Sequence, residues 1–430
     1  MSDYLNMSYE ELQEEYKKLQ IEYENIKKLN LNLDMSRGKP CKEQLDLSMG
    51  LFDNAKDPSS YISEDGFDCR NYGYLSGIPE AKRLFSQLLG VKESEVIIGG
   101  NSSLNLMYDT VARAMFFGVY GSEKPWMKYE KIKFLCPSPG YDRHFAITEA
   151  FGVEMIPVEM KEDGPDMDTI EKLVAEDETI KGIWCTPQYS NPDGITYSDE
   201  VVDRFARMKT KASDFRIFWD NAYCVHHLYD DDRANVKNIL TACKEAGNEH
   251  RVFIFFSTSK ITHPGAGISV LASSEKNIEF TLNQISKQTI CSDKLNQLRH
   301  VNFLKSVEGI NELMKKHAAI IRPKFEAVDK ILHEKLDGKN IARWTNPKGG
   351  YFISFFTLDG CARRVEELAK GAGLTLTKAG ATYPYGNNPR DNNLRIAPTL
   401  PPIEELKKAM EILAVCVKVA SIEKLLGKAS

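Results

Sequence analysis

Short apolar runs alternate with longer amphipathic segments through the middle of the chain. The runs are EVIIGG, IKFLCP, VEMIPVEM, KGIWCTP, FRIFWD and RVFIFF, which begin at residues 95, 132, 153, 181, 215 and 251. Short β-rich runs separated by helical stretches are typical of a mainly parallel sheet with helices on both faces. The pattern therefore predicts an α/β fold for this part of the chain.

The N-terminal segment has a different, helical pattern. Ser8 and Glu11 form a capping-box sequence that predicts a helix start. An apolar seam follows at spacings of four or three residues: Leu12, Tyr16, Leu19, Tyr23, Ile26 and Leu29. We expect this seam to pack on the body of the protein, although a coiled-coil dimer would use the same face.

The C-terminal part predicts a second, smaller domain. After Ile310 a long helical stretch precedes two strand-like runs, GGYFISFF and NNLRIAP, which lie among further helices. We expect an α+β domain here that the N-terminal segment joins. The predicted division is 1–55 for the N-terminal helix and joining segment, 56–310 for the large domain and 311–430 for the small domain.

Composition narrows the class of protein. The chain has 430 residues, 42% of them hydrophobic and 27% charged, with a formal net charge of −5. No apolar run reaches the roughly 20 residues that span a bilayer, and the N-terminus lacks the features of a signal peptide. Nine cysteines without a C-x-x-C pair indicate reduced thiols in a cytoplasmic protein. We expect no metal site, no membrane contact and, without a Lys/Arg block, no nucleic-acid partner.

One lysine stands out at the end of the last run, in FFSTSKITHPG. Lys260 follows a strongly apolar segment, although lysine is rarely buried without a partner. A strand end that emerges into water would explain it. The alternative is an amine held in a pocket as a covalent nucleophile.

Polar residues also follow the other predicted strands, where open parallel sheets bind ligands. Asn101 and Ser102 open a helix, which is either an ordinary cap or a phosphate site. Tyr141 lies on a turn, and Asn191 precedes a proline in another turn. Asp220, with Tyr223 three residues later, is either a helix cap or the partner of a cationic nitrogen.

Together these strand ends match the needs of one ligand, pyridoxal 5′-phosphate (PLP). Its aldehyde needs a lysine, its phosphate a helix N-terminus and its ring an aromatic face. Its pyridine nitrogen needs a carboxylate in order to stay protonated, which makes the ring an electron sink. The order of the candidates therefore favours the nucleophile interpretation of Lys260.

Several motifs resemble those of the fold type I, class I/II PLP-dependent aminotransferases over nearly the whole chain. NPDG, DNAY and STSK resemble the Asn-Pro, Asp-x-x-Tyr and Ser-x-Ser-Lys motifs of that family, and NYGYLSGIPEAKRLF, NPKGGYF and LRIAP resemble others. SRGKP is similar to the N-terminal glycine segment of the aspartate aminotransferase-like branch called type Ic or MocR-like. The resemblance implies a large domain with a mainly parallel seven-stranded sheet, a smaller α+β domain, and an obligate homodimer with shared sites.

The resemblance also implies roles for individual residues. Lys260 would form the Schiff base with PLP, Asp220 would pair with the pyridine nitrogen, and Tyr141 would stack on the ring. Asn191 and Tyr223 would hold the phenolate oxygen. Four residues would serve the phosphate: Asn101, Ser102, Ser257 and Ser259.

Substrate contacts and a partner contact follow in the same way. Arg395 would bind the substrate α-carboxylate, Gly38 would allow close backbone approach to the substrate, and Tyr72 would reach the cofactor of the neighbouring subunit.

The sequence departs from the family pattern at one position that would contact the phosphate. Many relatives carry an arginine eight residues after the lysine, where this chain has Ile268, so hydroxyls, amides and the helix dipole must hold more of the charge. His263 is a possible donor, although a solvated loop histidine explains it as well.

The predicted function is ping-pong transamination between an acidic amino acid, aspartate first, and a 2-oxo acid, with 2-oxoglutarate expected. Lys260, Asp220 and Tyr223 are the predicted catalytic residues, with neutral Lys260 as the base for the α-proton. A distal carboxylate needs a second cation, for which Arg37 and Lys39 flank Gly38, and Arg143 and Arg299 are further candidates.

Two other functions use the same cofactor residues. A β-lyase would differ in its products. A PLP-sensing regulatory domain would accompany a DNA-binding module, for which the acidic segment ahead of SRGKP is too short and wrongly charged.

Overall fold

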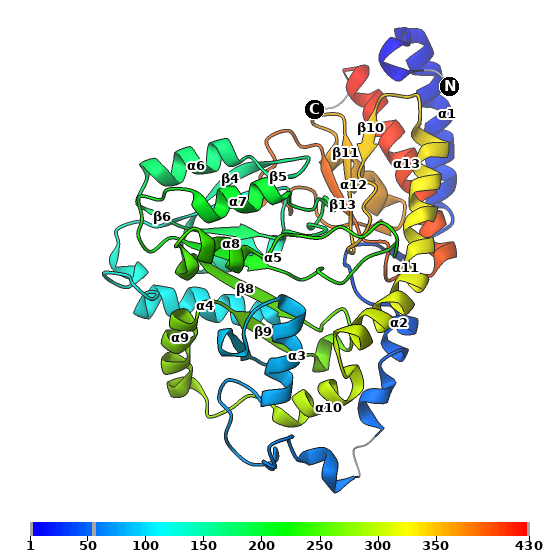
Figure 1. The fold of residues 1–430 in the computed structure, drawn as a ribbon. Coiled ribbons are helices and arrows are strands. Elements are labelled where there is room, and N and C mark those ends of the chain that lie inside the picture. The colour runs from blue at the N-terminus through cyan, green and yellow to red at the C-terminus, as the bar shows by residue number, and fades with distance from the viewer. Residues whose placement is uncertain (1–2, 54–56, 428–430) are drawn as a thin grey trace.

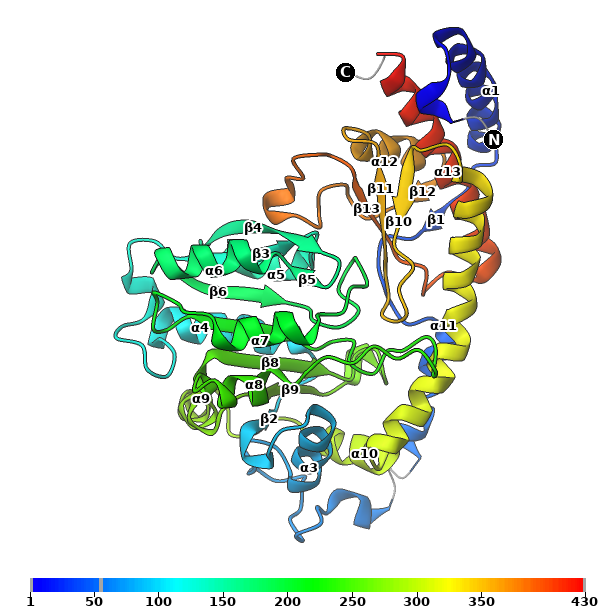
Figure 2. The ribbon, with the colours of Figure 1, turned by 45° about the horizontal axis from the view of Figure 1, so that its top comes forward.

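The computed structural model describes residues 3–53 and 57–427 of the chain. A mixed sheet forms the centre of the larger part of the molecule (Figures 1 and 2). Within the described residues this sheet has eight strands, in the order β2 (Val96–Ile98), β9 (Ser269–Ala272), β8 (Val252–Ser257), β7 (Arg216–Asp220), β6 (Ile180–Cys185), β3 (Lys133–Ser138), β4 (Glu154–Lys161) and β5 (Gly164–Pro165). The six apolar runs identified in the sequence all form strands of this sheet.

The sheet has one strand more than the seven that the resemblance implied. β5 pairs antiparallel with the end of β4, and Gly164 lies opposite Lys161. Gly164 has a φ of +142°, which side chains other than glycine rarely adopt, so the chain can reverse directly after β4. β9 is also antiparallel to both of its neighbours, whereas β3, β4, β6, β7 and β8 form the parallel part of the sheet.

Helices cover both faces of the sheet because alternate strand residues point in opposite directions. On β7, Ile217 and Trp219 belong to one apolar cluster and Phe218 to the other. The first cluster includes residues of α3 (Pro79–Leu89), α6 (Met167–Glu176), α7 (Asp199–Arg207), α8 (Ile239–Glu245) and α10 (Lys294–Leu304). The second includes residues of α4 (Ser103–Phe117), α5 (Asp142–Ala150) and α9 (Glu275–Gln288).

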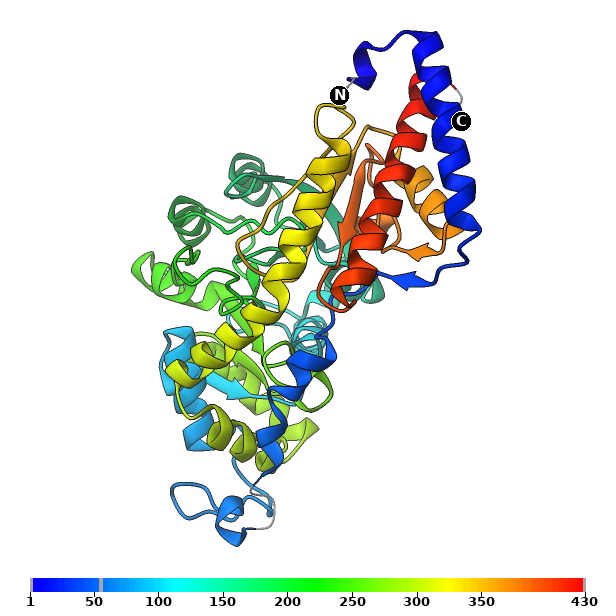
Figure 3. The ribbon, with the colours of Figure 1, turned by 90° about the vertical axis from the view of Figure 1, so that its right-hand side faces the viewer.

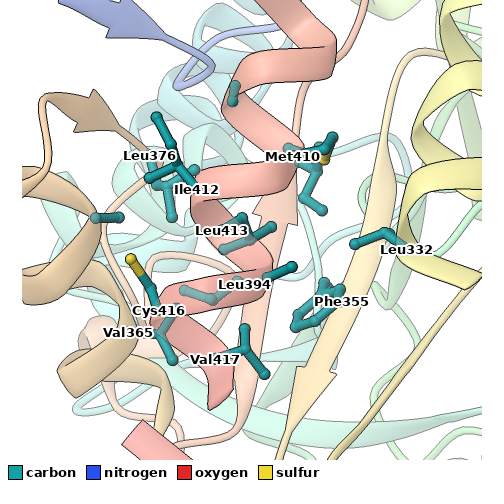
Figure 4. Packing of buried hydrophobic residues seen from close by; sticks show 14 of the residues in the cluster. Leu332, Phe355, Val365, Leu376, Leu394, Met410, Ile412, Leu413, Cys416 and Val417 are labelled. Carbon is teal, nitrogen blue, oxygen red and sulfur yellow. The ribbon is translucent and has the colours of Figure 1, made fainter. Parts of the chain in front are cut away.

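A third apolar cluster, called the C-terminal cluster below, contains the C-terminal elements. Its strands form a sheet of β10 (Ala342–Trp344), β11 (Ile353–Thr357) and β13 (Asn393–Ile396), with α11 (Val307–Leu336), α12 (Ala362–Gly371) and α13 (Ile403–Leu425) around it. Figure 4 shows how α13 places Leu413 and Val417 beside Phe355 and Leu394 of this sheet. All four side chains are almost fully buried.

The N-terminal helix α1 (Tyr9–Lys27) packs on this C-terminal cluster, beside α13 (Figure 3). The predicted capping box of Ser8 and Glu11 is present at its start. Leu12, Leu19 and Ile26 are buried in the cluster and Tyr16 and Tyr23 pack against it, so these residues of the seam pack on the chain itself, as predicted. Leu29 does not, because it lies after the end of the helix and is 54% exposed. After the helix, β1 (Leu33–Asp34) pairs with β12 (Leu374–Thr375), and the short α2 (Lys42–Asp46) follows.

The predicted boundary between residues 55 and 56 lies outside the described residues. The other, between residues 310 and 311, falls in the first turns of α11, which is one continuous helix. Its buried residues join the core of the large sheet as far as Met314 and the C-terminal cluster from Ile321 onward. The domain division therefore stays a prediction. Among the helices of the described ranges, none is both long and apolar enough to cross a membrane.

Candidate active site

A cavity of about 450 Å³ lies beyond the C-terminal ends of the parallel strands and reaches the C-terminal cluster. Many of the residues predicted for the site line it: Arg37, Gly38, Tyr141, Asn191, Tyr223, Lys260 and Arg395. They come from segments far apart in the sequence, because β3, β6, β7 and β8 end at the same edge of the sheet.

Lys260 follows the end of β8 and extends into this cavity rather than into bulk water. Its Nζ lies 5.1 Å from the ring centroid of Tyr223 and 5.8 Å from that of Tyr351. Burial lowers the pKa of Lys260, while the negative charge of Asp220 acts in the opposite direction. The surroundings therefore favour a neutral amine, which is the form that acts as a nucleophile or base.

Asp220 ends β7 and is 4% exposed. Its Oδ2 lies 3.0 Å from Nε2 of His144, and since a carboxylate oxygen accepts, Nε2 donates in this contact. Its Oδ1 is buried and has no hydrogen-bond partner among the described residues. An unfilled buried carboxylate oxygen is costly unless a ligand supplies a donor.

His144 is held in place by residues around it. Its ring stacks on Trp184 with centroids 4.5 Å apart and an interplanar angle of 8°. The Trp184 Nε1 donates to Thr148 Oγ1 over 2.8 Å, and that hydroxyl donates to the carbonyl of His144, also over 2.8 Å. His144 is not among the residues predicted from the sequence, because only its side-chain contact with Asp220 reveals its role.

These residues fit PLP. The free Oδ1 of Asp220 would accept a hydrogen bond from a protonated pyridine nitrogen, and Lys260 can supply the amine for the aldehyde. Tyr141, whose pKa is raised to about 12 by burial and then by Asp220, stays a neutral aromatic ring beside them. Tyr223 also stays neutral, because burial raises its pKa well above the usual value.

The four residues predicted for the phosphate meet near the N-terminus of α4. Ser257 Oγ donates to Ser259 Oγ over 3.1 Å, and Ser259 Oγ donates to the carbonyl of Asn101 over 3.4 Å. Ser102 is the N-cap residue of α4, yet its side chain makes no capping hydrogen bond. The first backbone N–H groups of this helix are therefore not engaged by the Ser102 hydroxyl, as an anion site requires.

Ile268, which stands where many relatives carry a phosphate-binding arginine, is buried in the core. Ile268 is 1% exposed, and its backbone N–H donates to Thr258 Oγ1 over 2.9 Å. His263 does not replace the arginine, because its Nε2 donates to the carbonyl of Leu45 over 3.0 Å and its ring stacks near Phe52. A phosphate here would thus rely on hydroxyls, backbone amides and the dipole of α4.

Arg395, on β13, lies on the opposite side of the cavity and is 7% exposed. Its Nη1 donates to Oδ1 of Asp142 over 2.8 Å and to Oδ1 of Asn191 over 3.3 Å. The guanidinium carbon lies 4.8 Å from the ring centroid of Phe352. Phe352 in turn lies against Gly38, where a Cβ atom would come within 2.5 Å of its ring.

Four exposed cations surround the mouth of the cavity: Arg37, Lys39, Arg143 and Lys378. None of them makes an ion pair with a described acidic side chain. The segment around Gly38 is turned rather than extended, since the N–H of Lys39 donates to the carbonyl of Arg37 over 3.1 Å. Lys378 was missed because its sequence carries no motif, and Arg299 lines a different cavity, beside Asp53 and Phe303.

Tyr72, the predicted cross-subunit residue, lies at the surface. Its side chain is 71% exposed, and its backbone N–H donates to Oδ1 of Asn71 over 2.9 Å. It does not line the cavity of its own chain. Its predicted role depends on a second subunit and stays a prediction.

Comparisons with known proteins agree with this geometry. Residues 7–429 match the family model described as aspartate amino-transferase. An aminotransferase of Mycolicibacterium smegmatis is 48% identical over 406 residues, which cover 94% of this chain and 95% of that protein. The aspartate aminotransferase of Corynebacterium glutamicum is 46% identical over 401 residues, or 93% of this chain and 92% of that protein.

Solved structures agree as well. The crystal structure of an aspartate transaminase from Corynebacterium glutamicum matches with a TM-score of 0.95 and 44% identity, covering 98% of this chain and 99% of that one. An α-aminoadipate aminotransferase from Thermus thermophilus, solved with N-(5′-phosphopyridoxyl)-L-leucine, matches in fold with a TM-score of 0.74 and 18% identity, over 90% of this chain and 92% of that one. The fold is that of the fold type I aminotransferases, and the chain belongs to the aspartate aminotransferase family.

Proposed function

We propose that this aminotransferase binds PLP through Lys260 and moves the amino group of an acidic amino acid to a 2-oxo acid. Aspartate is the first expected donor and 2-oxoglutarate the expected acceptor. The reaction would be ping-pong, so that the first product leaves before the second substrate enters. The name of the Corynebacterium glutamicum relative supports this choice of donor.

The observation that carries the proposal is the charge around the cavity. Arg395 lies at its inner side, and the four exposed cations at its mouth are free of ion pairs with described side chains. An amino acid with one carboxylate needs a single cation, whereas a dicarboxylate needs a second one. Arg37, Lys39, Arg143 and Lys378 offer it.

Different residues of the chain would carry out different parts of the transamination. When bound, PLP supplies an electron sink that makes the α-proton of an amino acid acidic. Lys260, kept neutral by burial, would take that proton and return it as a general acid. Asp220, fixed by His144, would keep a positive charge on the facing nitrogen. Arg395 would bind and orient the α-carboxylate.

Three finer points belong to the same proposal. The SRGKP segment beside the cavity supports the MocR-like, type Ic branch. The exposed Tyr72 supports a homodimer in which it reaches the neighbouring site, and light scattering of the purified protein would test the dimer. A cytoplasmic location without nucleic-acid or membrane partners stays a prediction from composition.

A panel assay tests the function. The purified protein, supplied with PLP, is incubated with single amino acids and 2-oxoglutarate, and glutamate and the new 2-oxo acid are measured. We expect kcat/KM for aspartate to exceed the values for alanine and phenylalanine by about tenfold or more, or ~1.4 kcal/mol in the transition state. A tenfold preference for either neutral donor would contradict the acidic-substrate proposal. Ammonia release without 2-oxoglutarate would instead indicate a β-lyase.

A further inference from the structure

Arg395 already holds a carboxylate in this structure, and that carboxylate belongs to the chain itself. Oδ1 of Asp142 accepts a hydrogen bond from Nη1 of Arg395 over 2.8 Å, inside the cavity that both residues line. The arginine side chain is 7% exposed, whereas that of Asp142 is 33% exposed. The guanidinium of Arg395 is therefore buried, whereas the carboxylate of Asp142 lies closer to solvent.

The guanidinium is not saturated by these contacts. Nη1 also donates to Asn191, while Nε is buried without a hydrogen-bond partner among the described residues. Arginine carries five N–H donors in a planar fork that suits two carboxylate oxygens. A single bond from Asp142 uses little of that fork.

We propose that Asp142 is an internal carboxylate that occupies Arg395 until the carboxylate of a substrate displaces it. The inference rests on the proposed function, in which Arg395 binds the α-carboxylate. Asp142 and the substrate would present the same chemical group to the same donor, so they compete for it. Asp142 would thereby set the affinity of the site for carboxylates.

The position of Asp142 allows such an exchange. It is the first residue of α5, where a carboxylate interacts favourably with the helix dipole even after it leaves Arg395. Rotation of a partly exposed side chain is fast, so the exchange needs no movement of the buried arginine or of the backbone. Arg143 and Lys378 at the cavity mouth favour a negative charge in the same region.

The exchange has a thermodynamic signature. Without Asp142, the empty site would leave a buried guanidinium without a charged partner, which destabilises the free protein. The same loss would remove a competitor, so an external carboxylate would bind more tightly. A residue that merely orients Arg395 would act differently, because its removal would weaken both the fold and the binding.

The test uses succinate, a dicarboxylate without an amino group, titrated by calorimetry into the PLP-loaded protein. We expect Asp142→Asn to lower the Tm measured without succinate and to lower the Kd for succinate by about fivefold or more. Asp142→Glu, which keeps the charge, should return both values toward those of the wild type. The control is Asp168→Asn, which removes one negative charge at an 88% exposed side chain paired with Arg204, and should change neither Kd nor the response to succinate.

An unchanged or higher Kd for Asp142→Asn, with normal binding by the wild type, would overturn the exchange and leave the proposed function intact. If the wild type itself binds no succinate at millimolar concentrations, the carboxylate site at Arg395 is wrong, and the exchange fails with it. Should Asp142→Asn not fold alone, a soluble, PLP-binding product obtained only with succinate in the buffer would support the exchange. Failure to fold with succinate present would count against it.

Discussion

Two buried aspartates at opposite ends of β7 have the same chemistry and opposite surroundings. Asp214 lies just before the strand and Asp220 is its last residue. Both oxygens of Asp214 are filled, by Lys181 Nζ at 2.7 Å and by Trp126 Nε1 at 3.0 Å. One oxygen of Asp220 is filled by His144, and the other has no partner among the described residues.

This difference in hydrogen bonding indicates that Asp214 serves stability and that Asp220 serves ligand binding. A fully paired buried carboxylate is satisfied by the protein alone, and it serves to hold the surrounding elements together. A carboxylate with one oxygen unfilled needs a donor that the fold does not supply. The N-terminal end of β7 is thus complete as folded, whereas the C-terminal end is arranged for a ligand.

The largest effect should come from Lys260, at the ligand end. We expect Lys260→Ala to abolish turnover and the yellow colour of PLP-loaded protein, because the other lysines that line the cavity, Lys39 and Lys378, are exposed at its mouth and do not follow β8 beside Asp220. Absorption spectra before and after dialysis against buffer without PLP would measure this. Lys260→Arg, which keeps a cation but stays protonated, should be inactive as well. A yellow, active Lys260→Ala protein would contradict the assignment.

The next effect concerns Asp220 itself. Asp220→Asn keeps the shape and a hydrogen-bonding group but removes the charge that keeps the facing nitrogen protonated. We expect kcat to fall by about 10²- to 10³-fold, in line with losing one preorganised electrostatic contact, while Tm changes little. Steady-state kinetics would measure the fall in kcat, and a thermal melt would show whether Tm is unchanged. A large loss of Tm with normal kcat would place Asp220 with the structural carboxylates instead.

Asp214 should give the reverse result. Asp214→Asn leaves the charge of Lys181 buried without its counterion, which costs about 3 kcal/mol of stability. Both side chains are 3% exposed or less, so solvent cannot replace the lost charge. We expect a clearly lower Tm and an unchanged kcat at a temperature where the variant is folded. The double variant Asp214→Leu, Lys181→Met should regain much of the stability, and its failure to do so would point to a further role for the pair.

Asp193 offers the most specific test, because it is a second carboxylate with an unfilled oxygen near the site. It is 5% exposed, Oδ1 lacks a partner among the described residues, and burial raises its pKa to about 7 despite the opposing effects of Ser354 and Arg343. Between about pH 4 and about pH 7 the folded protein keeps a proton that the unfolded chain has lost, so this carboxyl destabilises the fold as pH rises.

The change to test is Asp193→Asn, whose neutral side chain removes this pH dependence. We expect its Tm relative to wild type to rise from about pH 4 to about pH 7 and then to level off. Thermal melts of both proteins across that range provide the measurement. A Tm difference that is flat with pH would mean that Asp193 is ionised in the folded protein, and a ligand or ion would then have to fill its free oxygen.

The catalytic core of the site was predictable because its residues lie at the ends of strands or within three residues after them. Asp220 and Lys260 come after bulky apolar runs, and the geometry of a parallel sheet brings strand ends together without any knowledge of packing. The main strands were predictable for the same reason. β9 was missed because it has only four residues and follows soon after the glycine-rich segment HPGAG, which is typical of a loop.

Residues whose role depends on tertiary contacts were not predictable. His144 and Asp142 matter through single side-chain contacts with Asp220 and Arg395, which no local pattern encodes. Arg299 shares its residue type with the cations at the cavity, yet α10 carries it to another surface. Lys378 is the opposite case: no motif surrounds it in the sequence, yet the fold brings it to the cavity mouth.

The four cations at the cavity mouth have a practical consequence for protein engineering. They lie on the loop segment 37–39, at the start of α5 and in the segment after β12, and none of them belongs to the strands that carry Asp220 and Lys260. Exposed positions outside the core tolerate exchange better than buried ones. A combinatorial library restricted to Arg37, Lys39, Arg143 and Lys378 would therefore vary substrate choice without disturbing the chemistry, and selection for growth on new amino acids could search it directly.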